Sequence, residues 1–140
     1  MLGPLLRSMS LYLLVAFGGA LGSVARLAVN NAVTAQWGAG FPWGTLVVNI
    51  TGSFIIGFFF TLTEPHGRLP TGVPGRQFFM TGVCGGYTTF SSFSLQTLHL
   101  ARGGEWLRAG ANTLGSVAAC LIAVWLGHLL ASYINQTRGA

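Results

Sequence analysis

Long apolar stretches alternate with short polar segments along this chain, and the pattern predicts four membrane-crossing helices. The apolar stretches cover about residues 11–30, 44–63, 76–101 and 106–133. A helix needs about 20 predominantly apolar residues to cross a hydrocarbon core of ~30 Å, and each stretch meets that requirement. We therefore expect an all-α integral membrane protein in which residues 1–140 form a single transmembrane domain.

The segments between the predicted helices carry loop signals. Residues 31–43 contain no charge and end in Phe41-Pro42-Trp43, whose aromatic rings suit the membrane interface. Residues 64–75 contain three of the five prolines and form the longest predicted loop. Shorter polar segments are expected at 1–10, 102–105 and 134–140.

Small and polar residues recur every four positions within the predicted helices, and such stripes allow helices to approach closely. The first helix carries Gly18, Gly22, Arg26 and Asn30. The second carries Thr45, Asn49, Ser53 and Gly57, and the fourth carries Asn112, Ser116 and Cys120.

Two residues on these stripes each allow two interpretations. An amide in hydrocarbon is costly without a partner, so Asn49 either bridges to a neighbouring helix or contacts an ion. Arg26 lies near the end of the first predicted helix. It either extends to the lipid headgroups or lies in an aqueous vestibule that attracts anions. The residues alone leave both pairs open.

The third apolar stretch contains the densest run of glycines and hydroxyls, Gly82 to Ser94. Gly85-Gly86 and Thr88-Thr89 are poor helix formers, so we expect the helix to break near Gly85–Thr88. A broken membrane helix leaves free backbone groups that can build an ion site. Beyond the break, Phe90 and Phe93 share a helix face with Ser94 and Thr97. Aromatic edges and hydroxyls are both groups that a small anion could use.

Composition supports the membrane assignment and excludes a nucleic-acid partner. Hydrophobic residues make up 51% of the chain and charged residues 6%, whereas a soluble domain carries about 25% charged residues. The formal net charge is +5, but there is no lysine, and the seven arginines are scattered singly. Nucleic-acid surfaces carry clustered basic residues instead.

Catalytic and coupling chemistry is missing from the sequence, so we do not expect an enzyme. The only acids, Glu64 and Glu105, lie in predicted loops, so proton-coupled transport lacks its usual carboxylate. The three histidines lie at no ligand spacing to Cys, Asp or Glu, which argues against a transition-metal site. We interpret Cys84 and Cys120 as small hydrophobic residues. We also interpret the first apolar stretch as a retained helix, because it is long for a signal peptide.

The run Gly85-Gly86-Tyr87-Thr88-Thr89-Phe90-Ser91-Ser92-Phe93-Ser94 resembles the signature Gly-Gly-x-Thr-Thr-Phe-Ser-x-Phe-Ser of the Fluc (CrcB-type) fluoride channels. Gly44-Thr45-Leu46-Val47-Val48-Asn49 is similar to the second-helix motif of that family, and the glycine-rich first helix with Arg26 also fits. The resemblance extends from about Leu11 to Leu130.

The resemblance implies a fluoride-selective passive channel in the bacterial plasma (inner) membrane that lets fluoride leave the cell. It implies an antiparallel, dual-topology homodimer with two pores along the interface. It also implies a central sodium ion, held by the backbone carbonyls of Gly85 and Thr88, that we interpret as structural. The family usually has a small or hydroxyl-bearing residue where this chain has Asn112. The implied fluoride pathway comprises Asn49, Thr89, Phe90, Ser91, Phe93, Ser94, Asn112 and Ser116, with Arg26 in the vestibule.

Four crossings would put both termini on one side of the membrane, with almost no arginine bias. Arg7, Arg68, Arg76 and Arg138 would lie on the terminal side, against Arg26, Arg102 and Arg108 on the other. This balance fits insertion in both orientations, and it also fits an orientation fixed by other means.

Two other functions are possible for such a chain. A small efflux transporter of cationic drugs should carry a glutamate inside the membrane, and this chain has none there. A membrane scaffold would explain the glycine stripes but not the stripe of phenylalanines and hydroxyls.

Overall fold

The computed structural model describes the backbone of residues 2–137 and the side chains of residues 8–137, and its regular structure is helical throughout. Arg138 lies outside the described residues, as does the side chain of Arg7. The helices are α1 (Leu2–Trp37), α2 (Trp43–Leu62), α3 (Val73–Arg76), the π-helix η1 (Gln77–Cys84), α4 (Gly85–Tyr87), α5 (Phe90–Arg102) and α6 (Trp106–Gln136).

Three of the described helices are long and apolar enough to cross a membrane, which supports the predicted all-helical membrane protein. These spans are Ser8–Trp37, Trp43–Leu62 and Trp106–Gln136. The remaining helical chain is divided: α3, η1 and α4 follow one another without interruption, and α5 is a separate helix of 13 residues. The third predicted crossing therefore consists of two shorter helical pieces.

The first helix is longer than the predicted 11–30, so the expected exposed start at 1–10 and part of the loop at 31–43 were wrong. Residues 31–37 contain neither glycine nor proline, and nothing in them stops the helix. The helix ends where Gly38 adopts a φ of +80° and its N–H donates to the carbonyl of Thr34 at 2.9 Å. This left-handed glycine is a common helix terminator.

The break in the third crossing lies at Thr88 and Thr89, which both have extended backbone angles. The expected break near Gly85–Thr88 is confirmed at Thr88, whereas Gly85 and Gly86 are helical and do not form it. Gly86 serves close packing instead, since a Cβ atom there would collide with the backbone of Gly19.

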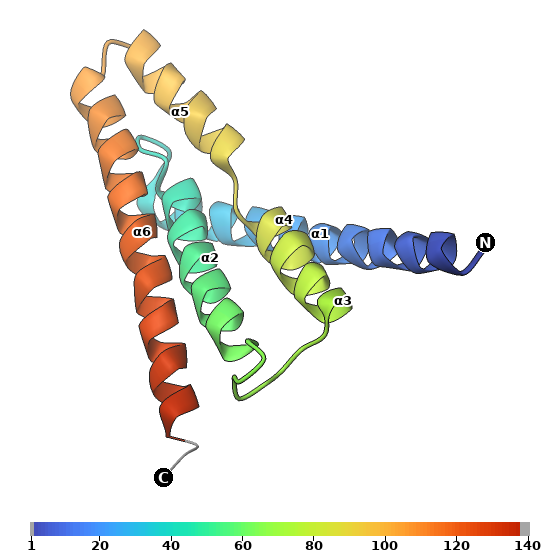
Figure 1. Cartoon of the computed structure of the whole chain (residues 1–140). Helices are drawn as coiled ribbons and strands as arrows, with labels where there is room; N and C mark the ends of the chain where they lie inside the picture. The colour runs from blue at the N-terminus through green and yellow to red at the C-terminus, as the bar shows by residue number, and fades with distance from the viewer. Residues whose placement is uncertain (1, 138–140) are drawn as a thin grey trace.

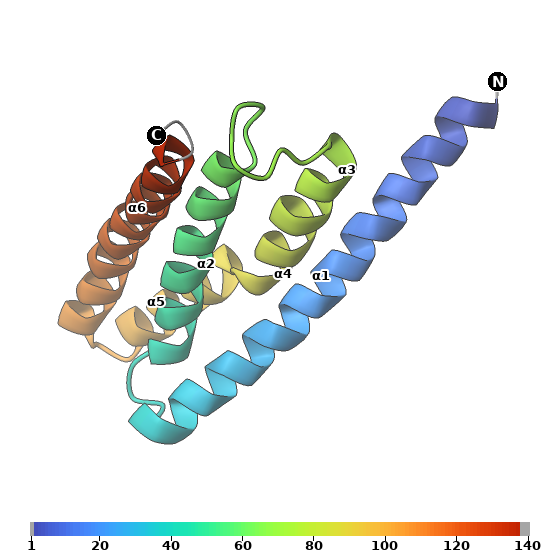
Figure 2. The same ribbon diagram turned by 90° about the horizontal axis from the view of Figure 1, so that it is seen from below.

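Glycines bring the helices into backbone contact at two crossings. Where α1 crosses η1 and α4, a Cβ atom on Gly22 would collide with the carbonyl of Val83. Where α2 packs along α6, Gly57 and Gly127 each lie against backbone of the facing helix. Figure 1 shows α2 beside α6, and Figure 2 shows α1 running obliquely past α4.

The connections gather at opposite ends of the helical body. In Figure 2 the start of α1, the end of α6 and the loop 63–72 lie toward one end. The short connections 38–42 and 103–105 lie toward the other end. The break between α4 and α5 lies between these ends, beside α2 (Figure 1).

Candidate functional site

The break at Thr88 and Thr89 opens a pocket of about 240 Å³ between α2, α5 and α6. Five residues of the predicted pathway line it, from three separate parts of the chain. Its complete lining is Asn49, Ser53, Thr88, Thr89, Phe90, Phe93, Ser116, Val117 and Cys120.

Asn49 holds the broken segment through both ends of its side-chain amide. Its Nδ2 donates to the carbonyl of Thr89 at 3.0 Å, and its Oδ1 accepts from the Thr89 N–H at 2.8 Å. Of the two interpretations of Asn49, the bridge to a neighbouring helix is therefore present. Because an amide nitrogen carries two hydrogens, one remains that could face an ion.

Thr89 starts the second half of the broken helix. Its hydroxyl oxygen accepts from the backbone N–H of Ser92 at 3.2 Å, which caps the N-terminus of α5. The helix dipole makes this end partially positive, whereas the C-terminal end of α4 on the other side of the break is partially negative. Backbone groups of opposite polarity therefore meet at the break.

Phe90 and Phe93 lie in contact but in different surroundings. Their ring centroids are 5.3 Å apart, with the ring planes tilted by 48°. Phe93 is only 8% exposed, whereas Phe90 is 76% exposed at the surface of the single chain. The Phe93 ring is therefore held in place by its neighbours, whereas the Phe90 ring can contact a molecule that covers this face of the chain.

A chain of polar side chains connects α6 to α5 beside the pocket. The Ser116 hydroxyl donates to Oδ1 of Asn112 at 3.3 Å, and Nδ2 of Asn112 donates to the Thr97 hydroxyl at 2.8 Å. Thr97 in turn donates to the carbonyl of Phe93 at 2.8 Å. Ser116 lines the pocket, but Asn112 does not, and its buried amide joins the two helices.

Ser91 and Ser94 do not line the pocket either. Both are exposed, and the Ser94 hydroxyl donates to the carbonyl of Phe90 at 2.9 Å. Ser94, four residues after Phe90, lies on the same helix face as Phe90.

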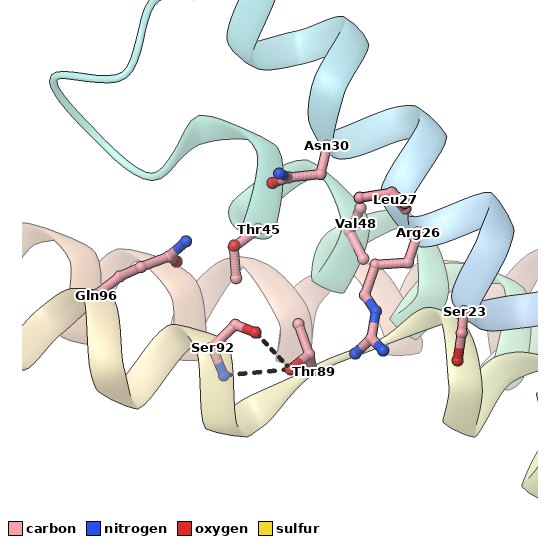
Figure 3. Close-up of a pocket in the computed structure, with 9 residues that line it drawn as sticks. All are labelled: Ser23, Arg26, Leu27, Asn30, Thr45, Val48, Thr89, Ser92 and Gln96. Atoms are coloured by element: carbon pink, nitrogen blue, oxygen red, sulfur yellow. Dashed lines mark hydrogen bonds between the residues drawn. The ribbon is translucent and has the colours of Figure 1, made fainter.

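A second cavity, of about 390 Å³, lies on the α1 side of the break (Figure 3). Arg26 extends into it from α1 toward Thr89, and its Nη1 donates to the carbonyl of Thr88 at 3.3 Å. The Arg26 guanidinium is therefore held at the break. Thr89 lines both cavities and so lies between them.

Sequence reasoning named only part of this lining. Thr45 and Ser53 lie on the same stripe as Asn49, so their spacing could have identified them. Ser23 and Gln96 carry no such signal, and Ser92 belongs to the Gly82–Ser94 run. Only the tertiary arrangement of α1, α2 and α5 brings the three residues to the second cavity.

The two carbonyls assigned to sodium lie on different surfaces of the chain. Gly85 is exposed on the outer face, whereas the Thr88 carbonyl accepts from Arg26. Among the described residues no cluster of three or more His, Cys, Asp or Glu could hold a metal. A cation here would therefore depend on backbone oxygens, which are chemically suitable ligands for a hard ion.

The comparisons with known proteins agree on one family. The family model described as CrcB-like protein, Camphor Resistance (CrcB), matches residues 13–128. A protein from Opitutus terrae named fluoride-specific ion channel FluC is 62% identical over 132 residues, covering 94% of this chain and all of that protein. The protein of the same name from Rhodospirillum rubrum is 60% identical, covering 89% of this chain and 97% of its own length. These matches confirm the resemblance that the Gly85–Ser94 run carries.

Proposed function

Because this chain belongs to the CrcB-like protein family, we propose that it is a fluoride-selective passive ion channel of the bacterial inner membrane. It lets fluoride leave the cell down its electrochemical gradient and so lowers cytoplasmic fluoride. The observation that carries the proposal is the pocket at the break, where neutral donors and a phenylalanine edge surround one space.

The pocket suits an anion that must exchange tightly held water for other donors. The free hydrogen of the Asn49 amide supplies a hydrogen bond, and the edge of Phe93 adds a weakly positive surface. The hydroxyls of Thr89 and Ser116 donate to Ser92 Oγ and Asn112 Oδ1 in this structure, so each must rotate toward the ion to bind it. None of these groups carries a full positive charge. An ion can therefore bind strongly enough to enter and weakly enough to leave.

The cavity that holds Arg26 serves as the vestibule. A fixed positive charge in a recess raises the local concentration of anions. Because Thr89 lines both cavities, an ion that moves from the vestibule to the pocket passes its side chain. Nothing in this route requires a chemical reaction, in keeping with a channel rather than an enzyme.

The functional unit is an antiparallel homodimer with two pores along its interface. Phe90 and Gly85 are exposed on the single chain, and so are Gln77 and Thr81, whose side chains are hydrogen-bonded to each other at 2.6 Å. Lipid tails offer no hydrogen bonds to such groups, whereas a second copy can. The near balance of arginines at the two ends is compatible with both orientations.

A sodium ion at the centre of that dimer would be held by the carbonyls of Gly85 and Thr88 from both subunits. The two subunits together would supply four such oxygens, twice the number from one chain, and backbone carbonyls are suitable ligands for a hard cation. The partially negative C-terminal end of α4 favours a cation at this point. We assign the ion a structural role, since no acidic side chain is present to regulate it.

Passive fluoride release from liposomes that contain the purified protein tests the proposal. We expect rapid release of fluoride but not of chloride. Phe93→Ile should abolish fluoride release while leaving the dimer intact. Phe58→Ile is the matched control, because the Phe58 ring stacks on Phe54, away from the pocket.

Each outcome has a distinct meaning. No release by the wild-type dimer, with sodium present, would contradict the channel proposal and favour a membrane scaffold. Wild-type release by Phe93→Ile would contradict the assigned pathway. Loss of the dimer in Phe93→Ile would assign the ring to assembly.

A further inference from the structure

A third recess, of about 350 Å³, lies at the end of the molecule that carries the connections 38–42 and 103–105. Residues 39–42 form one of its walls, and Gln96, His99, Glu105 and Arg108 line the other. Gln96 also lines the cavity that contains Arg26, as Figure 3 shows. The outer recess, the Arg26 cavity and the pocket therefore adjoin one another, with Gln96 and Thr89 as the shared residues.

The outer recess contains a paired charge. Nη1 of Arg108 donates to Oε2 of Glu105, three residues before it at the start of α6. Glu105 is one of only two acids in the sequence, and the other, Glu64, lies in the loop at the opposite end. Glu105 is therefore the one acidic side chain that this chain itself places at this end.

This pair contributes little to the stability of the fold. The two side chains are 58% and 43% exposed, and ion pairs in contact with water are screened by it. The charges of this pair can nevertheless act on a mobile ion when one of them loses its partner. An unpaired charge acts over ~30 Å at 0.01 M salt but over only ~3 Å at 1 M.

We propose that the outer recess is the mouth of the anion pathway and that Arg108 masks the carboxylate of Glu105 there. This inference rests on the proposed fluoride channel. With the pair intact, the mouth carries no net negative charge, and fluoride reaches Gln96 and the Arg26 cavity without repulsion. Without Arg108, the carboxylate repels fluoride before it reaches the vestibule.

The test compares charge-neutralising variants in the fluoride-release assay at low (~10 mM) and high (~500 mM) ionic strength. Arg108→Gln should slow release about two- to fivefold at low salt, and the difference should disappear at high salt. Glu105→Gln with Arg108→Gln should restore the wild-type rate. Arg102→Gln is the control, because it removes the same charge from the same end but outside the recess. It measures the general loss of positive charge, and at low salt it should slow release less than Arg108→Gln does.

A second single variant keeps the test valid if Arg108→Gln does not fold. Glu105→Gln alone leaves the arginine unpaired and should raise the low-salt rate above wild type. Equal slowing by Arg102→Gln and Arg108→Gln, no rescue in the double variant, or an unchanged rate in Glu105→Gln would each overturn the inference. Absence of fluoride release by the wild type would instead overturn the proposed function on which it rests.

Discussion

Replacement of Asn49 by leucine tests how the broken helix is held in place. Leucine has a similar size but cannot hydrogen-bond, so both bonds to the backbone of Thr89 are lost. Thr89 is only 7% exposed, and water cannot easily replace these bonds. The change thus leaves one buried N–H and one buried C=O without their partners.

The size of the effect follows from these two groups. A buried backbone group left unsatisfied costs about 1–3 kcal/mol, so Asn49→Leu should destabilise the protein by about 2–6 kcal/mol. For a chain of this length, each kcal/mol lowers the melting temperature by about 3–6 °C, which gives a fall of at least ~6 °C. With Thr89 released, the pocket loses its shape, and fluoride release should stop.

The assay is thermal unfolding of the purified protein in detergent, together with fluoride release from liposomes. Thr51→Val is the control on the same helix. The exposed Thr51 hydroxyl bonds to the Tyr87 hydroxyl at 2.9 Å and to the carbonyls of Val47 and Val48 in its own helix, so its loss leaves no buried backbone group of the break without a partner. This variant should lower the melting temperature by less than ~3 °C, because exposed substitutions of this kind usually cost about 0.5 kcal/mol or less.

Two outcomes would refute this reasoning. A wild-type melting temperature with wild-type release would mean that the amide is dispensable. A wild-type melting temperature with abolished release would mean that Asn49 acts by contacting the ion, the other interpretation that the sequence leaves open.

Three further predictions concern the packing, the helix cap and the pocket lining. Gly22→Ala should destabilise the protein by about 1–3 kcal/mol in thermal unfolding, because the new Cβ would meet backbone of η1 and the Tyr87 nitrogen at 2.7 Å. Gly110→Ala, which meets nothing within 4 Å, should not, and equal effects would contradict the packing argument. Thr89→Val removes the cap of α5 and should cost about 1 kcal/mol in the same assay, and an unchanged melting temperature would show that the cap is unimportant. A small thiol reagent should block fluoride release through Cys120, which lines the pocket, and Cys120→Ala should resist it, whereas block of that variant would implicate the buried Cys84.

Much of the fold could be predicted from the sequence because its signals are local. Apolar length identifies the spans, and four-residue spacing identifies the glycine stripes that bring α1 against η1 and α4. The Gly85–Ser94 run likewise identified the region of the candidate site and, through its resemblance, the family. Local signals misplaced the end of the first helix only because the stop lies at one residue, Gly38.

Tertiary structure decided where the third helix breaks and which side chains meet there. The glycine pair near the expected break stays helical, with α1 packed against Gly86, and the break falls where Asn49, 40 residues away, binds the backbone of Thr89. Packing also turned Asn112 away from the pocket and brought Gln96 between two cavities. These contacts join residues that are distant in the chain. Their positions depend on how whole helices pack, and no pattern within one segment specifies that.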